Sequence, residues 1–495
     1  MSNGSALETQ SWWSRPAGAR EVLQIALPMV VTTLSWTLMN FIDTAILMRV
    51  SETAMAAAYT AIIIWFASIS LLYGLCSYSS TFVAQYFGDG QPRKIGPVVW
   101  QGVWLALSFS LVIPVAQALA PALFAQFGHI GELAALETKF FQVLCYGAPG
   151  MLAAQSLECF YSGRGKTWVV MVVDMCAVLV NLVLACILVL GIWGVESWGV
   201  AGAAWATVIA QWWRAGVYAT LVLQAANRAE FNTAEVKPSW TLIRRMLRFG
   251  GPSGVQMMLD IGGFAVFMLL VGRLGLEETA ATSLAFRISQ VAFMPVWGFG
   301  MATAVLVGQK LGEDRPDLAV RASRTALALC VTYMGTLSLL FVLAPRLFLQ
   351  GFFLHGAEAG ATLAGTQALT IQLMRFVAAY NLFDAVAIIF VSVLRGAGDT
   401  RFVMLLSLCM ATLLAGGTAV AVLYLGADVY GAWWFITVWV WALALVYFLR
   451  YRGGQWKSMR VIDQVHHGHL PVDAVHDHAA RPLRPEHRAP ASVAK

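Results

Sequence analysis

The stretch VAQYFGDGQP at residues 83–92 returns as VGQKLGEDRP at residues 307–316, in the second half of the chain. The two stretches are identical at four positions: Val83 and Val307, Gln85 and Gln309, Gly88 and Gly312, Pro92 and Pro316. In each stretch we expect the Gly to end a helix and the Pro to begin the following turn. The repetition predicts two copies of one structural unit.

Other matching residues keep the same order along the chain. Pro28 matches Pro252 at the same spacing as the repeated stretch. Gly163 in SGRGKT matches Gly396 in RGAGDT at a wider spacing. The wider spacing predicts extra residues in the second copy, and HGAEAGATLAGT from His355 is the natural candidate.

The composition is that of a membrane protein. Of the 495 residues, 59% are hydrophobic and only 12% are charged, whereas a soluble domain carries roughly 25% charged residues. Apolar runs of about 20 residues are long enough to cross the bilayer as helices, which satisfy their own backbone groups there. We predict an all-α integral membrane protein with about twelve spans, beginning near Val22, Met55, Ile95, Phe140, Trp168, Trp198, Met246, Thr279, Ala319, Thr366, Phe402 and Val429.

Basic residues gather in alternate joints between these spans, on the side of both termini. Because Lys and Arg stay on the cytoplasmic side, both termini are predicted to be cytoplasmic. Six helices per copy would give the two halves the same orientation, as in transporters built from parallel repeats. This bias accounts for the net charge of +6, so we expect a lipid bilayer and no nucleic acid as partner.

These patterns predict five segments along the chain. A cytoplasmic N-terminal segment covers residues 1–21, and the first six helices cover residues 22–225. A polar linker at residues 226–245 precedes the other six helices at residues 246–452. The hydrophilic, His-rich tail at residues 453–495 is predicted to be cytoplasmic and disordered.

A repeated helical bundle of this kind is typical of a secondary transporter. The sequence contains no filter-like loop or charged ring expected of a channel. It also has no GxxxxGK[ST] loop for a nucleotide, which argues against a primary pump. We therefore expect no enzymatic activity, no cofactor and no resident metal other than a transported or coupling ion.

Seven segments together resemble the multidrug and toxic compound extrusion (MATE) family, and most of all its NorM-like branch. They are ALPMVV with FIDTAIL, VAQYFGDGQPRK, YSGRGKT, GGPSGVQMMLD, FMPVWGFGMATAVLVGQKLGEDRP, YNLFD and VLRGAGDT. The resemblance implies a V-shaped bundle with two lobes, in a bacterial-type inner membrane. It also implies an antiporter, with a monomer expected, that exports cationic amphiphilic compounds as Na+ or H+ enters.

Carboxylates inside the spans are the candidate coupling residues, since ionisable groups are costly in the bilayer. A carboxylate in low dielectric can take up a proton or bind a cation. The resemblance assigns this role to Asp43 and Asn181 in the first half, and to Asp260, Tyr380 and Asp384 in the second.

Two positions depart from the family's pattern. Ala185 stands where a second polar residue is usual, which favours proton binding at Asp43. Asp260 stands where the family has a longer Glu, which leaves the identity of the ion open between Na+ and H+. An alternative is that Arg287 or Arg375 neutralises Asp260 or Asp384 in a structural ion pair. We expect Asp174, Glu158 and Arg214 near the cytoplasmic interface.

Thioether and aromatic side chains are the candidates for the substrate cleft, because Met surfaces repack around varied ligands and aromatic faces attract cations. They are Met257, Met258, Phe264, Phe267, Met294 and Trp297. Structural or gating roles are expected for Pro28, Gln85, Gly88, Pro252, Gln309, Gly312 and Gly396. Two other functions stay open: a lipid-linked oligosaccharide flippase of related architecture, and a receptor or scaffold without transport.

Overall fold

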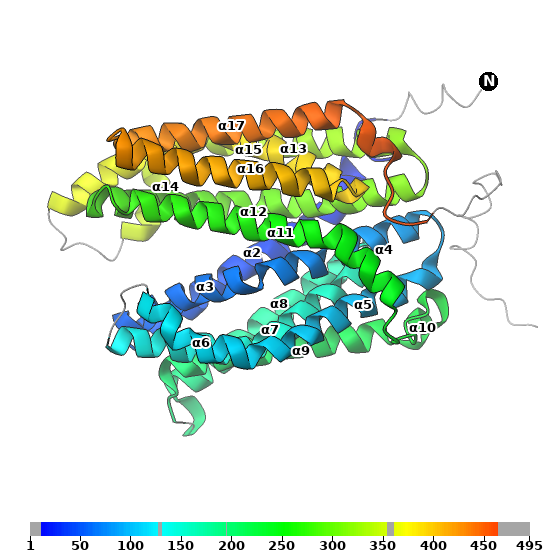
Figure 1. The fold of residues 1–495 in the computed structure, drawn as a ribbon, viewed down its shortest axis with the longest axis horizontal. Coiled ribbons are helices and arrows are strands. Elements are labelled where there is room, and N and C mark those ends of the chain that lie inside the picture. Colours follow the sequence, from blue (N-terminus) through cyan, green and yellow to red (C-terminus); the bar gives the residue numbers. More distant parts are fainter. Residues whose placement is uncertain (1–10, 127–130, 195, 354–360, 464–495) are drawn as a thin grey trace, which may run out of the picture. The chain divides into compact units, whose positions relative to one another are not determined.

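The computed structural model describes residues 11–126, 131–194, 196–353 and 361–463. The beginning of the expected insertion at His355 and most of the His-rich tail therefore lie outside the described residues. The chain up to Ile462 forms one compact unit. Its described residues are almost entirely helical (Figure 1).

The first half of this unit contains long helices joined by short turns. In chain order they are α2 (Ala19–Met48), α3 (Glu52–Ser77), α4 (Ser79–Gly88), α5 (Ile95–Ser108), α6 (Ile113–Gln126), α7 (Glu132–Ser162), α8 (Thr167–Leu190) and α9 (Gly199–Val222). A short helix, α10 (Ala225–Phe231), lies in the linker between the halves.

The second half repeats this order. Its helices are α11 (Trp240–Val271), α12 (Leu276–Gly312), α13 (Pro316–Leu343), α14 (Pro345–Phe353), α15 (Ala361–Ala397), α16 (Thr400–Ala419) and α17 (Val429–Arg452). A π-helical turn, Val420–Tyr424, extends α16. Helix α11 begins at Trp240, inside the segment predicted as the linker.

Ten segments of the described chain are long and apolar enough to span a membrane. In the first half, α3 with α4 forms one of them and α5 with α6 another. The two remaining long helices of that half, α7 and α9, are not among the ten. Helix α7 carries charges such as Glu137 and Glu158, and α9 is rich in Ala and Gly. With these two, each half has the six long segments that the repeat predicts.

Packing between helices repeats as the sequence does. Helix α3 packs on α7 as α12 packs on α15, and α2 packs on α8 as α11 packs on α16. Across the halves, α2 packs on α12 and α11 packs on α3. Figure 1 shows α11–α17 as one layer and α2–α9 as the other, with α4 where the layers approach each other. The predicted fold of two six-helix repeats is confirmed.

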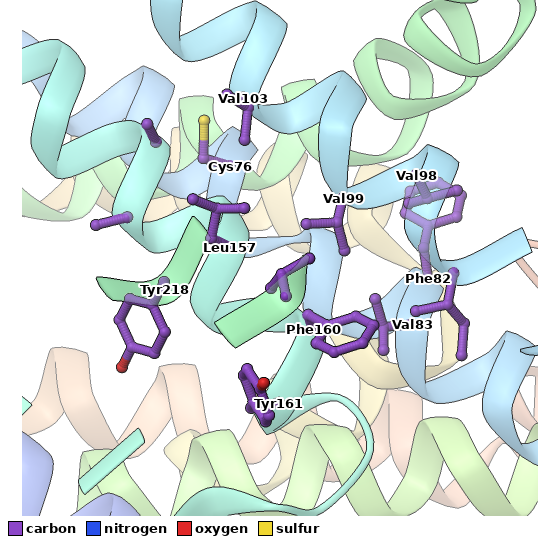
Figure 2. Close-up of a cluster of buried hydrophobic side chains, with 14 of the residues drawn as sticks. Cys76, Phe82, Val83, Val98, Val99, Val103, Leu157, Phe160, Tyr161 and Tyr218 are labelled. Atoms are coloured by element: carbon purple, nitrogen blue, oxygen red, sulfur yellow. The ribbon is translucent and has the colours of Figure 1, made fainter. Parts of the chain in front are cut away.

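A cluster of buried side chains holds the first half together at the end where α4 lies. Figure 2 shows Phe82, Val99, Leu157 and Phe160 among its members. They come from α4, α5 and α7, and each is almost fully removed from solvent. Burying one such side chain contributes about 1.5–3 kcal/mol, so the cluster fixes the position of α4 and of the repeated sequence at its end.

The prediction of a disordered tail from residue 453 is wrong for residues 453–462. After α17 the chain forms a 3₁₀ turn, Gln455–Ser458, and Trp456, Val461 and Ile462 are all buried. Three large apolar side chains so close together supply enough apolar surface to hold the segment against the bundle. The hydrophilic composition of the rest of the tail concealed them.

Candidate functional site

Asp43 lies in α2 with only 6% of its surface exposed. It interacts with Asn181 on α8 and with Thr207 on α9. Asn181 in turn donates from Nδ2 to Thr207 Oγ1 at 3.3 Å. The structure therefore brings together the two candidates of the first half and adds Thr207. The sequence signal for Thr207 was weak, because a single Thr in an Ala-rich helix usually bonds only to its own backbone.

This cluster contains polar atoms without partners. Within the described residues, Asp43 Oδ1 and Asn181 Oδ1 are buried and accept no hydrogen bond. A buried acceptor that lacks a donor is costly, by about 1–3 kcal/mol. Two such oxygens on adjacent helices can be satisfied by a proton on the carboxyl group or by a bound cation, which is the chemistry of a coupling site.

A group of buried charges lies in the same half. Arg214 on α9 donates from Nε to Asp174 Oδ1 on α8 at 2.6 Å, and its Nη2 contacts Glu158 on α7. Tyr218 donates to Asp174 Oδ1 at 3.0 Å. All three charged side chains are at most 4% exposed. We call Glu158, Asp174 and Arg214 the charge triad.

The triad was not predicted from the sequence. The sequence pattern placed all three residues near the cytoplasmic interface, with no pairing among them. The signal was present in the spacing, because Arg214 and Tyr218 are one helical turn apart and face the same side of α9. Next to the triad lies a small hollow of about 20 Å³ that opens to its surroundings. Its lining includes Ser35, Trp36, Met39, Asp174, Gln211 and Arg214.

The second half arranges its carboxylates differently. Tyr380 and Asp384 lie one turn apart on α15 and interact with each other, and Ser289 on α12 is beside Tyr380. Asp260 on α11 is exposed, accepts a hydrogen bond from Gln256 Nε2 at 3.3 Å and interacts with Ser407 on α16. The expected set is thus divided in this structure, with Tyr380 beside Asp384 and a separate environment around Asp260.

The alternative in which Arg287 or Arg375 neutralises a carboxylate can be compared with the contacts of these two arginines. Arg287 and Arg375 are both exposed. The guanidinium of Arg287 lies over the ring of Tyr59, 4.9 Å from its centroid. In the described residues, neither arginine forms an ion pair with Asp260 or Asp384.

The six candidates for the substrate cleft fall into two groups. Met258, Phe264 and Trp297 are exposed, and Met257 and Met294 are half-buried. Phe267 is fully buried and packs with Phe286 in the core of the second half. Phe267 therefore does not line an open surface in this structure, whereas the other five are accessible.

The repeated stretches meet where the two halves approach each other. Gln85 donates from Nε2 to the carbonyl oxygen of Gly396 at 3.0 Å. Gln309 donates from Nε2 to the carbonyl oxygen of Gly163 at 2.8 Å. Each repeated Gln thus reaches the repeated Gly of the opposite half. We call this region the crossing end of the bundle.

Glycine is required where the two stretches cross. A Cβ at Gly88 would collide with the backbone oxygen of Gln309, and one at Gly312 would collide with that of Gln85. A Cβ at Gly396 would lie 2.5 Å from the backbone oxygen of Ala304. Close contact between the two backbones therefore requires Gly in both copies of the repeated stretch. Pro28 and Pro252 lie inside α2 and α11, and each of these helices packs against the opposite half.

One cation of the crossing end is buried among aromatic rings. Arg164, in the turn between α7 and α8, lies over Phe160 at 3.8 Å and over Phe231 at 4.3 Å from the ring centroids. Burial lowers the pKa of Arg164 to about 10. The residue stays protonated at neutral pH and attaches α10 to this turn through cation–π contacts.

Comparison with known families and relatives matches both halves. The family model MatE matches residues 28–187 and 252–419, two ranges that begin at the repeated prolines. A probable multidrug resistance protein NorM from Bradyrhizobium diazoefficiens is 30% identical over 391 residues, 78% of this chain and 82% of that protein. The multidrug resistance protein MdtK from Edwardsiella ictaluri is 28% identical over 405 residues, 80% of this chain and 85% of that protein.

Solved structures share the fold. A MOP superfamily transporter from Pyrococcus furiosus superposes with a TM-score of 0.80 at 20% identity, covering 89% of this chain and 97% of that one. A eukaryotic MATE transporter superposes with a TM-score of 0.77 at 20% identity, covering 88% of this chain and 96% of that one. At these identities the likeness concerns the fold alone.

Proposed function

Because the chain belongs to the MatE family, we propose that it is a secondary active multidrug efflux antiporter. It exports cationic amphiphilic organic compounds as Na+ or H+ enters. The observation that carries the proposal is the buried cluster of Asp43 and Asn181, whose unpartnered oxygens suit a proton or a cation. We further propose that the protein lies in a bacterial-type inner membrane, with the crossing end and both termini facing the cytoplasm.

The position of Asp43 suggests how ion binding reaches the rest of the bundle. Helix α2 carries Asp43 and packs directly on α12 of the other half. Thr33 Oγ1 donates to the Met294 carbonyl oxygen at 3.0 Å across this contact. Pro28 removes one backbone hydrogen bond from α2 and so makes it easier to bend. Protonation of Asp43 would change the packing of α2 and thereby shift α12, which carries Gln309.

In the second half we propose a cation site formed by Asp260, Tyr380 and Asp384. Tyr380 and Asp384 already lie together, and Asp260 would have to approach them in another state of the transporter. Each inward passage of one positive charge contributes about 2.3 kcal/mol per 100 mV of membrane potential. That is enough to bias a conformational equilibrium whose two states differ by a few kcal/mol.

Transport can be tested with inside-out vesicles that contain the purified protein. Uptake of a cationic dye is measured with a Na+ gradient and with a pH gradient separately. Acceleration by either gradient supports the proposal. A flippase would instead move a lipid-linked pyrophosphate and leave the dye outside. A receptor or scaffold would move neither molecule.

Coupling in the second half needs a separate measurement. Drug affinity is titrated against Na+ at several pH values, for the wild type and for Asp384→Asn. Linkage requires that the ion and the drug weaken each other's binding by the same factor. Equal drug affinity under all conditions in the wild type would rule out coupling by competition. An unchanged ion response in Asp384→Asn would place the coupling at Asp43 alone.

A further inference from the structure

The chain crosses back over the bundle after its last long helix. Residues 453–462, which we call the strap, begin with Gly454 in a left-handed conformation (φ +73°) that turns the chain at the end of α17. Trp456 is 1% exposed and packs in the core of the second half with Leu394 and Tyr447. Its ring also stacks on Tyr451 with centroids 5.3 Å apart. The strap is therefore anchored in the second half.

The other end of the strap is buried in the first half. Val461 and Ile462 are 2% and 6% exposed, and they belong to the same buried cluster as Tyr78 and Phe82. Figure 2 labels Phe82 in this cluster. Arg460, between the two anchors, pairs with Asp314 at 3.0 Å, in the second copy of the repeated stretch. The strap thus joins the cores of both halves at the crossing end.

The strap also completes the hydrogen bonds of a crossing glutamine. The backbone N–H of Val461 donates to Gln85 Oε1 at 2.8 Å, while Gln85 Nε2 donates to the Gly396 carbonyl oxygen. Gln85 is fully buried. If the halves separated here, the amide of Gln85 would lose partners from both the strap and the opposite half. Breaking buried hydrogen bonds is costly unless water replaces them.

The corresponding segment of the first half does not connect the two halves in the same way. At the spacing that relates Gly202 to Gly431, the strap matches residues 224–233. Those residues pack on their own half: Phe231 joins the same cluster, and Trp100 Nε1 donates to the Thr233 carbonyl oxygen at 2.9 Å. The repeat alone therefore does not require a segment that crosses between the halves.

We propose that the strap is a latch, which holds the crossing end closed through Val461 and Gln85 and limits how often this end opens. The inference rests on the proposed transport function, because opening of this end matters only if the two ends open alternately. It assigns to residues 453–462 a regulatory role: whatever pulls Val461 away from Gln85 would raise the population of the state that is open at this end.

The test measures opening directly, without substrate or ion gradient. Spin labels are placed at Arg93 and Asp317, which are exposed joint residues of opposite halves. Val461→Pro removes the N–H donor and is expected to raise the population of long distances about tenfold, the effect of losing one buried hydrogen bond. Val461→Ala keeps the N–H and removes only buried side-chain atoms, so its effect should be the same whether residue 85 is Gln or Leu.

A double-mutant cycle separates the hydrogen bond from general damage. Gln85→Leu removes the acceptor, so adding Val461→Pro to it should change the distances no further. Equal shifts in both backgrounds, or a distance distribution unchanged by Val461→Pro, would overturn the latch. Should the Pro variant not fold, a chain ending after Met459 must show the same opening. Because no transport is measured, failure of the transport proposal would appear separately, in the dye assay of the wild type.

Discussion

Two pairs of positions related by the repeat are similar in burial but differ in side chain, with an acidic residue in one half and an aromatic residue in the other. At the spacing that relates Pro28 to Pro252, Asp43 matches Phe267, and both are buried. Trp36 matches Asp260, and both are at least partly accessible, Trp36 in the hollow beside the charge triad. The scaffold thus provides one enclosed and one open position in each half. The first half has its carboxylate in the enclosed position, and the second half has it in the open one.

This difference indicates how strongly each charge is tied to its surroundings. A buried charge interacts in a low dielectric and must be compensated by its neighbours. A carboxylate in the more open position, such as Asp260, has neutral neighbours in Gln256 and Ser407 and depends less on any one ion pair. We therefore expect substitutions in the first half to have larger effects than those in the second, and three variants test that order.

The largest effect is expected for Arg214→Met. Removing the guanidinium would leave Glu158 and Asp174 buried without their cation. Breaking a buried ion pair in this way destabilises a protein by about 3–5 kcal/mol. The measurement is the midpoint of unfolding in detergent, followed by the loss of monodisperse protein on heating or in denaturant.

The matched control is Arg375→Met, which removes an exposed arginine from a long helix of the other half. It should change stability by less than about 0.5 kcal/mol. A second comparison is Glu158→Gln, which leaves Asp174 paired with Arg214. It should lower the stability of the protein less than Arg214→Met does. Similar unfolding midpoints for Arg214→Met and Arg375→Met would show that burial does not determine how strongly a substitution destabilises the protein.

The sequence predicted the scaffold better than the triad, for a physical reason. Gln85, Gly88 and their repeats could be found because both copies make the same contacts. Only Gly fits where the two backbones touch, and each Gln donates to a Gly carbonyl oxygen of the other half. The triad leaves no such pattern. Its three residues come from three helices, and each one alone looks like a charge near a helix end. Their pairing depends on how α7, α8 and α9 pack.

Other residues were hidden by their neighbourhood. Thr207 is one polar residue in an Ala-rich helix, and only the fold shows that it faces Asn181. Trp456 and Val461 stand beside a hydrophilic tail, so composition averaged over that region predicted disorder. Asp260, Tyr380 and Asp384 could be selected as intramembrane polar residues, but sequence could not show that Asp260 interacts with Gln256 and Ser407 while Tyr380 interacts with Asp384.

The second variant, Asp43→Asn, is expected to abolish coupled export while the protein stays folded. Asn keeps the size and can still bond to Asn181 and Thr207, but it cannot exchange a proton. The lost contribution is about 2.3 kcal/mol per 100 mV for one charge, or roughly fiftyfold in the accumulation ratio. Dye accumulation in inside-out vesicles is the measurement, and export at the wild-type level would exclude Asp43 as the switch.

The smallest effect is expected for Asp260→Glu, which keeps the charge and lengthens the side chain by one methylene group. Because the charge is kept and Gln256 and Ser407 can still bond to the carboxylate, the change in its interactions should stay below about 1 kcal/mol, the net contribution of one hydrogen bond. The Na+ concentration that half-saturates the loss of drug affinity should therefore change by no more than about fivefold. Asp260→Asn serves as the control, since it keeps the length but removes the charge and should weaken the response more. If Asp260→Glu instead altered the Na+ response as strongly as Asp43→Asn alters export, Asp260 would have to become enclosed in the ion-bound state, beside Tyr380 and Asp384. The open position of the second half would then close during transport, and the contrast between the halves would belong to this one state of the molecule.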